Sequence, residues 1–384
     1  MLWCAALLAA GIALGLQFPL PYYVPLLAAS VLACTLLRAS RHWHDVLTLL
    51  VWLLLGCSRA AICPACDIEL RRQDAVRGKA QSVQTALVKR LQTAGLSPST
   101  LALCSALTVG KKDGLERETR LSYRQVGVSH LLALSGMHLG IVYAVLYLVL
   151  IRGVRHTRWR WFSLPLVLLC LWGYTLVAGM PVSLLRAALM LSVFTVISLM
   201  QYETDPLHPL ALSAIIILLI APTDLLSISF QLSFTATFFL LALWVPLRDK
   251  FPTLPWAVRL LATSCIAQVG TMPLTLYYFH QLPLLAPLLS LLVIPLTTII
   301  IYLTLAAMAL PIAPLGWMLN VLQELQQRII DLAGSIPGAT LTDIRPSVTA
   351  VVLMYGAMLL AIVRMRSGRR WAMDNGRWAM KIGN

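Results

Sequence analysis

The sequence predicts an all-α fold, a polytopic transmembrane helical bundle of about 11–12 spans with external amphipathic helices. Hydrophobic residues make up 59% of the 384 positions and charged residues only 12%, whereas soluble domains carry about a quarter charged residues. Apolar runs close to the roughly 20 residues that a helix needs to cross a bilayer recur along the chain. The composition therefore excludes a soluble globular protein and makes the lipid bilayer an expected partner.

The apolar runs justify the helices in order. They lie at about 2–18, 20–37, 46–60, 129–151, 161–178, 182–200, 207–221, 229–247, 257–279, 284–310 and 347–363. Arg and Lys gather in the loops after the second, fourth and eighth runs, and cytoplasmic loops are enriched in these residues. The charge pattern thus favours a cytoplasmic N-terminus and places 61–128 outside.

The end of the chain leaves three alternatives open. Eleven spans would put the basic C-terminal tail outside, where a positive tail is disfavoured. A twelfth crossing at 315–334 would correct this, but Glu324 and Arg328 on that stretch are typical of a surface-lying amphipathic helix. The third alternative is that 284–310, interrupted by Pro295, enters the membrane and returns.

The composition divides the chain into four segments: a three-span region (1–61), an external basic amphipathic segment (62–128), a transmembrane domain (129–365) and a basic tail (366–384). In the external segment, Val83, Leu87 and Leu91 fall on one helical stripe, and further helices are expected at about 99–109 and 115–126. Residues 59–125 hold twelve basic and six acidic residues. This net charge of +6 fits either helix faces resting on lipid headgroups or a cationic rim that gathers a polyanion.

Polar residues inside the apolar runs all reach the outer ends of their predicted spans. The candidate site residues are His130, Ser135, Gly136, His138, Ser183, Arg186, Gln231, Ser233, His280, Gln281 and Ser290. Intramembrane polar groups face a bundle interior or a water-filled cavity, so the sequence predicts an outward-open, hydrated vestibule. A buried guanidinium needs an acidic partner or an anion; few carboxylates lie at this depth, so Arg186 is expected either to bind a ligand phosphate or to extend to the outer surface.

Several local patterns have simpler readings. Gly136 and Gly140 form a small-xxx-small pair typical of close helix packing. The alternation in 229–238 resembles a strand, but a lone strand is not stable in lipid, so a helix is expected, whose Phe side chains either stack bases or pack the bundle. The pair Cys63 and Cys66 is half a zinc site or a local disulfide. With no carboxylate near the two histidines, we expect no metal, and with no phosphate-binding loop, no cofactor.

Five motifs resemble the ComEC competence family of bacterial inner-membrane proteins. His-Leu-Leu-Ala-Leu-Ser-Gly-Met-His-Leu-Gly at 130–140 is similar to the family signature, and Gly-Val-Ser-His at 127–130 resembles its lead-in. Ala178-Gly179 with Ser183 and Arg186, Phe-Gln-Leu-Ser-Phe at 230–234, and the region 280–296 are similar to further elements in the family's order. The likeness covers about 75–365.

The resemblance implies a multi-pass protein of the bacterial inner membrane that conducts single-stranded DNA during natural transformation, with the matching polar residues lining the passage. The chain would be the channel core, without the external OB-type domain and the C-terminal metallo-β-lactamase-like domain of many members. A cytosolic DNA translocase, a separate nuclease or DNA-receptor protein, and a second copy of the chain are the expected partners. The alternatives are a permease of the same family without a DNA role, and an intramembrane serine hydrolase using Ser135 with His138 or His280.

Overall fold

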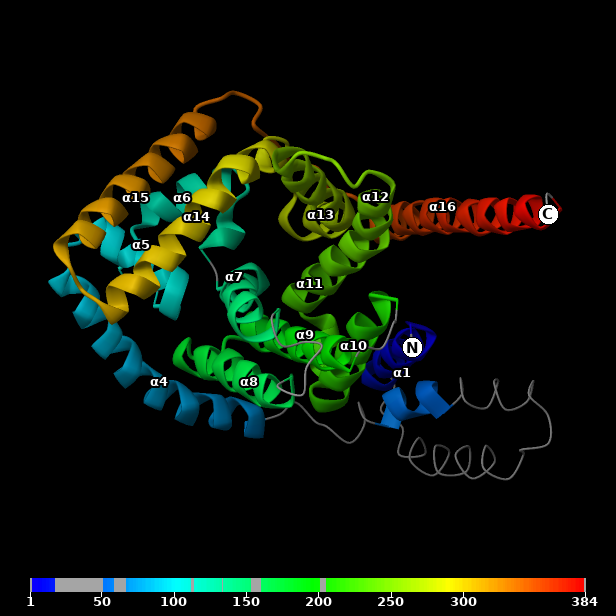
Figure 1. The fold of residues 1–384 in the computed structure, drawn as a ribbon, viewed down its shortest axis with the longest axis horizontal. Coiled ribbons are helices and arrows are strands. Elements are labelled where there is room, and N and C mark those ends of the chain that lie inside the picture. Colours follow the sequence, from blue (N-terminus) through cyan, green and yellow to red (C-terminus); the bar gives the residue numbers. More distant parts are fainter. Residues whose placement is uncertain are drawn as a thin grey trace.

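The structure is a computed structural model that describes residues 2–17, 51–58, 67–111, 114–132, 134–152, 160–200 and 205–382. It is a helical bundle in which the described strands form one short two-stranded sheet (Figure 1). The all-α prediction is therefore confirmed. The expected run at 20–37, residues 46–50 and 59–60 of the next run, and the pair Cys63 and Cys66 lie outside the described residues.

Five helices in the described part of the chain are long and apolar enough to cross a membrane. They are Val182–Leu199, Ile228–Lys250, Trp256–Phe279, Ala286–Ala309 and Val348–Met365. Shorter apolar helices cover Cys4–Leu14, Pro98–Val109, Gly136–Ile151, Trp161–Val177 and Leu207–Ile220. These helices make the chain a multi-pass membrane protein, while the total of 11–12 spans stays a prediction.

One hydrophobic cluster joins the segment before residue 128 to two late helices. Its elements are α4 (Asp67–Thr93), α5 (Pro98–Val109), α6 (Arg117–Gln125), α14 (Ala286–Ala309) and α15 (Ala313–Gly334). The helices α5 and α6 appear where the sequence predicted them. Ser97 caps α5 by accepting from Thr100 N–H, with Pro98 in the first turn. Because α5 buries Leu103 and Leu107 against this cluster, it belongs to the core of the bundle.

The predicted stripe on α4 needs a correction. Val83 is 44% exposed, and the buried face instead runs through Ala80, Gln84 and Leu91. The Nε2 group of Gln84 donates to Val109 O (2.9 Å) and Val177 O (3.0 Å). A polar residue thus replaces Val83 on the inner face, because it satisfies carbonyl groups at the C-terminal ends of two other helices.

The helix α14 excludes one of the three alternatives for the end of the chain. Pro295 lies inside a continuous α14, so the prediction that 284–310 enters and returns is wrong. The strands β1 (Gln281–Pro283) and β2 (Thr340–Thr342) pair antiparallel, with Gln281 opposite Thr342. The end of α15 therefore returns to the edge where α14 begins, and the two helices lie side by side (Figure 1).

The face of α15 explains why its sequence looked amphipathic. Arg328 and Glu324 form an exposed ion pair of 2.6 Å, while Gln326 is fully buried and donates to Tyr123 Oη (3.2 Å) and Thr297 Oγ1 (3.1 Å). Burial among these groups raises the pKa of the Tyr123 phenol, so it stays a neutral hydroxyl. The polar residues of α15 thus serve both an exposed face and a buried network.

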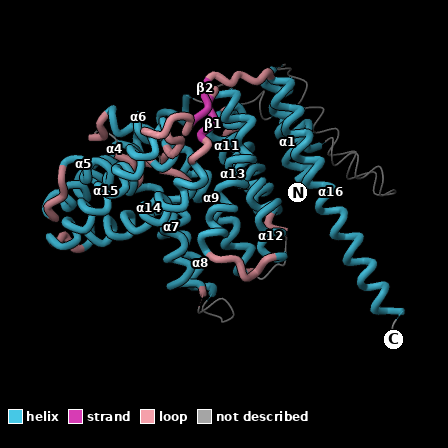
Figure 2. The backbone as a smooth tube through the Cα atoms, turned by 90° about the horizontal axis from the view of Figure 1, so that it is seen from above, coloured by secondary structure: helices cyan, strands magenta, loops and turns pink. Residues whose placement is uncertain are grey.

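A second cluster packs α7 (Gly136–Leu146), which continues into a π-helical turn, η2 (Tyr147–Ile151), against α8 (Arg160–Val177) and α9 (Val182–Leu199). A third joins α1 (Leu2–Gln17) to α10 (Leu207–Ile220). A fourth holds α11 (Ile228–Phe239), its π-helical turn η4 (Leu240–Trp244), α13 (Trp256–Phe279) and α16 (Val348–Ile382). Figure 2 shows the two strands at one edge of the bundle and α12 (Val245–Lys250) at the opposite edge, with α16 extending away.

Candidate functional site

The start of α7 is the first part of the site. The sequence predicted a continuous apolar helix over 129–151, and this is wrong at its beginning: a 3-10 turn, η1 (Ser129–Leu131), comes first, and Ser135 is extended (φ −124°, ψ 174°) before Gly136 opens the helix. Ser135 and His138 form a reciprocal capping box. The two polar residues thus end the preceding segment and fix where α7 begins.

The capping box sets the tautomer of His138. The backbone N–H of Ser135 donates to His138 Nδ1 (3.4 Å), and Ser135 Oγ lies 3.1 Å from the same nitrogen. Because Nδ1 accepts, the proton of the neutral ring resides on Nε2. His138 is fully buried, and its Nε2 has no hydrogen-bond partner among the described residues. It is therefore a buried donor without an acceptor.

His130 lies beside this group on η1. Its ring is exposed and hydrogen-bonds with the backbone of Gly127, and it is close enough to His138 to interact electrostatically. Gly127 has a φ of 78°, and a Cβ there would overlap the ring of Pro283. Only glycine fits this turn without strain, which brings the lead-in of η1 against strand β1.

The start of α9 is the second part. Gly179 and Met180 both adopt positive φ values, 81° and 50°, and turn the chain from α8 into α9. Ser183 Oγ then donates to Leu134 O at 2.6 Å, and a Cβ on Gly136 would lie 3.3 Å from the Cβ of Ala187. The beginnings of α7 and α9 therefore pack directly against one another. Gly140 has no such close neighbour, so only Gly136 of the pair supports close packing.

Arg186 lies in the second turn of α9 and is 2% exposed. Its Nη2 donates to Ser229 Oγ at the start of α11, while Nε and Nη1 are buried without a hydrogen-bond partner in the described structure. The charge of Asp224, on the 3-10 turn η3 (Pro222–Leu226), acts favourably on the guanidinium. The side chain is thus directed into the protein, and the predicted alternative that it extends to the outer surface is not seen.

Asp224 and Ser229 are site residues that the sequence reasoning missed. The expectation that few carboxylates reach the depth of Arg186 overlooked Asp224, which precedes the eighth apolar run by only a few residues. The signal was available: the connection from α10 to α11 is short, so its carboxylate has to stay close to the outer ends of both helices. Which arginine it approaches is decided by helix packing.

The start of α11 and the end of α13 form the third part of the site. Gln231 Nε2 donates to Leu225 O (3.1 Å), and Tyr278 Oη donates to Gln231 Oε1 (2.8 Å). Ser233, two residues further along α11, is half-buried, and its carbonyl accepts from Thr237 Oγ1 (2.9 Å). Tyr278, which the sequence reasoning also missed, therefore ties α13 to the polar face of α11.

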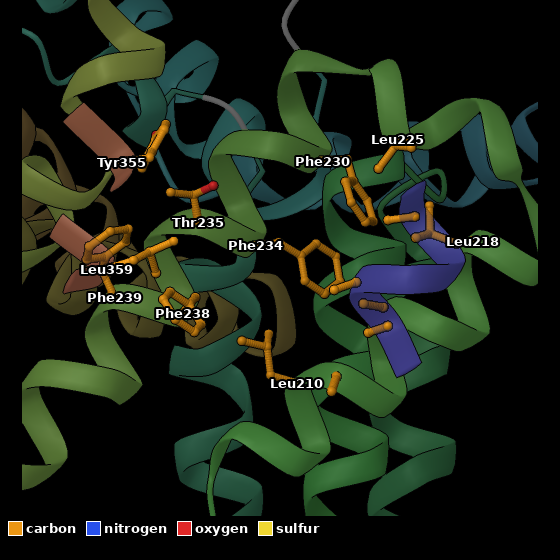
Figure 3. A pocket seen from close by; sticks show the side chains of 15 residues that line it. Leu210, Leu218, Leu225, Phe230, Phe234, Thr235, Phe238, Phe239, Tyr355 and Leu359 are labelled. Carbon is orange, nitrogen blue, oxygen red and sulfur yellow. The ribbon is translucent and has the colours of Figure 1, made fainter. Parts of the chain in front are cut away.

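The Phe side chains of α11 serve another face. Phe230 and Phe234 lie 4.3 Å apart between ring centroids, and both line an apolar cavity of about 380 Å³ between α1, α10, α11 and α16 (Figure 3). The segment 228–239 is helical, as predicted. We considered two roles for these rings, stacking on bases and packing of the bundle. Their placement among apolar side chains agrees with packing.

The remaining candidates are placed around the strands. His280 ends α13 in the left-handed region (φ 56°), is exposed, and its Nδ1 lies 3.1 Å from Leu276 O. Gln281 pairs with Thr342 in the two-stranded sheet. Ser290 is 6% exposed inside the cluster of α14, with its hydroxyl bonded to Ala286 O (2.7 Å). The structure thus keeps His280 and Gln281 next to α13 but places Ser290 in the core.

The hydrogen bonds connect the starts of α7, α9 and α11 and the end of α13 in sequence. Leu134 accepts from Ser183, Arg186 donates to Ser229, and Gln231 accepts from Tyr278. The end of α13 leads directly into β1, and Gly127, just before η1, lies against Pro283 of that strand. This continuous polar layer in a largely apolar chain is the candidate site.

The geometry around His138 differs from that of a serine hydrolase. In a serine hydrolase the ring nitrogen remote from the serine is held by an acidic group, whereas His138 Nε2 has no partner in the described chain. The capping box accounts for the approach of Ser135 to His138. No group of three or more His, Cys, Asp or Glu residues that could hold a metal occurs within the described ranges.

Comparison with known proteins defines the class. The family model described as "Competence protein" matches residues 107–367, which contain the whole polar layer. The chain is therefore a multi-pass membrane protein. It belongs to the Competence protein family.

Individual relatives match only in part. The chain is 35% identical to ComE operon protein 3 of Bacillus subtilis over 204 residues, 53% of this chain and 25% of that protein. It is 30% identical to Recombination protein 2 of Haemophilus influenzae over 207 residues, 50% of this chain and 26% of that protein. It is 27% identical to the Uncharacterized protein MG316 homolog of Mycoplasma pneumoniae over 77% of this chain and 73% of that protein. The chain thus aligns with about a quarter of the first two relatives, and no solved structure matches it.

Proposed function

We propose that this protein forms the inner-membrane passage for single-stranded DNA during natural transformation, and that the polar layer lines its periplasmic entrance. The observation that carries the proposal is the hydrogen-bonded series of polar groups at the starts of α7, α9 and α11 and the end of α13. Membership of the Competence protein family supports it, as does the net charge of +15, which suits a polyanionic substrate.

The layer contains the features that a strand of nucleic acid needs at an entrance. His130, Ser229 and His280 are exposed, whereas the donors of His138 and Arg186 are buried. A strand would meet hydrogen-bonding groups first and the fixed positive charge next. A cytosolic translocase would pull the strand, and a separate nuclease or receptor would deliver it; two copies of the chain sharing one entrance would also fit this arrangement.

Natural transformation with chromosomal point variants tests the proposal. In a competent host that carries this protein, we expect Arg186→Ala and His138→Ala to lower transformant frequency by about 100-fold or more, because each removes a donor from the entrance. Arg328→Ala is the matched control, because it removes an arginine from an exposed ion pair on α15. Immunoblots of the membrane fraction establish equal protein levels. Unchanged DNA uptake in both site variants would favour a permease of the same family without a DNA role.

Thiol labelling tests whether the layer is wet. In a cysteine-free background, Ser135→Cys and Gln231→Cys should react with a membrane-impermeant thiol reagent added from the periplasmic side, because both positions are half-buried at the proposed entrance. Ser290→Cys is the internal control and should stay unlabelled, because Ser290 is enclosed by the α14 cluster. Failure of the first two positions to react would remove the hydrated entrance.

A further inference from the structure

The unpartnered polar groups of the site share one property. Arg186 Nε, Arg186 Nη1 and His138 Nε2 are all buried N–H donors without an acceptor in the described structure. Leaving a buried donor unpaired costs about 1–3 kcal/mol, and more for a charged group. Three donors at neighbouring helix starts are therefore not explained by packing alone, and an acceptor-rich ligand would satisfy them.

We propose that Arg186, assisted by His138, binds a single phosphodiester anion at the junction of α7, α9 and α11; this rests on the proposed function and specifies what the entrance recognises. A phosphodiester carries one negative charge and only hydrogen-bond acceptors. It therefore matches a site in which every unsatisfied hydrogen-bonding group is a donor. Both the backbone of DNA and the headgroup of a phospholipid offer this group.

The helix starts add a second attraction for an anion. Gly136, Val182 and Ile228 are the first residues of α7, α9 and α11, and the start of a helix carries partial positive charge. Ser183 ties the start of α9 to Leu134 before α7, and Arg186 Nη2 reaches Ser229 in the first turn of α11. The guanidinium thus lies where three positive helix ends converge.

A singly charged anion suits the site better than a doubly charged one. Asp224 is half-buried, and its charge already acts on Arg186. A dianionic phosphate monoester would bring more negative charge than the arginine and the helix ends offset in a poorly solvated position, whereas a diester adds one. Gly136 at the start of α7 and Ser229 at the start of α11 are both exposed, which gives an anion a route to the buried donors.

Binding to the full chain in lipid nanodiscs provides the test. The probe is a fluorescent single-stranded 12-nucleotide DNA, compared with the same sequence on a neutral methylphosphonate backbone. Arg186→Gln should weaken DNA binding about tenfold and lower the slope of log affinity against log salt by about 0.7, the value for one lost phosphate contact on a single strand. Binding of the neutral strand should not change. Arg186→Lys should retain part of the affinity, and Arg328→Gln should behave as the unaltered protein.

A second arm separates the sources of the phosphodiester. Native mass spectrometry of the protein released from nanodiscs reports retained phospholipid in the unaltered chain and in Arg186→Gln. If Arg186→Gln spares DNA binding but loses a retained phospholipid, the anion site stands and the DNA entrance fails. If folded Arg186→Gln and Arg186→Lys both keep the DNA affinity and the lipid retention of the unaltered protein, the proposal is overturned.

Discussion

Two regions of the bundle bury polar side chains, and they do so in opposite ways. In the cluster of α5, α6, α14 and α15, Gln326 donates to Tyr123 and Thr297, and the atoms left without a partner are acceptors, the Oε1 atoms of Gln326 and Gln327. At the starts of α7, α9 and α11, the atoms left over are donors of Arg186 and His138. A spare neutral acceptor inside a network is a modest cost, whereas a spare cationic donor calls for a ligand. The first region is the scaffold, and the second is the candidate site.

The scaffold is expected to be the region more sensitive to added volume. A Cβ at Gly316 on α15 would overlap the carbonyl oxygen of Ala94 after α4. Gly316→Ala should therefore lower the free energy of unfolding by about 3 kcal/mol or more, because backbone has to move. Thermal unfolding in detergent measures this. Gly78→Ala, at an exposed position of α4 with no neighbour within 4 Å, should leave the midpoint unchanged; equal effects of the two would contradict the close approach.

The site should show the reverse behaviour. Arg186→Met removes a buried charge and keeps most of the volume, so thermal stability should stay the same or rise while DNA uptake falls by about 100-fold, equivalent to about 2.7 kcal/mol. Transformation frequency and thermal unfolding of the same variant measure the two effects. A parallel loss of stability and uptake would place Arg186 in the scaffold and remove the contrast.

The buried network predicts an intermediate effect. Gln326→Leu leaves Tyr123 and Thr297 without their shared donor, which should cost about 1–3 kcal/mol of unfolding free energy. Tyr123→Phe in the same background should restore part of it, because it removes a hydroxyl left unpaired. Urea or detergent denaturation of the two single variants and the double variant gives the unfolding free energies of a double-mutant cycle. Strict additivity would show that the hydrogen bond carries no coupling.

The smallest expected effect separates two glycines of one motif. Gly136→Ala places a methyl group 3.3 Å from the Cβ of Ala187, where α7 packs against α9. The free energy of unfolding should therefore fall by less than about 1 kcal/mol. Gly140→Ala meets nothing within 4 Å and should be neutral or slightly stabilising, because alanine favours the helix. Thermal midpoints of the two variants, measured side by side, check the order.

Much of the fold followed from pattern alone because apolar run length and helix caps are local properties. The Pro98 start of α5, the charged helix α6 and the helix over 228–239 agree with the structure. The errors arose where tertiary contacts overrode the pattern. Val83 fits the apolar stripe but Gln84 is buried, because two carbonyl groups needed a donor; Pro295 looked like a break, but α14 stays continuous within its cluster.

The sequence by itself determined that the chain is an all-α membrane protein, because too few charged residues exist to solvate a soluble surface, and it identified the motifs that place it in its family. Only the tertiary structure decided which polar residues meet. Ser290 lies in the core, Asp224 and Ser229 join Arg186, and Tyr278 joins Gln231. Depth along a helix can be counted from the sequence, but the direction in which a side chain faces depends on how the neighbouring helices pack.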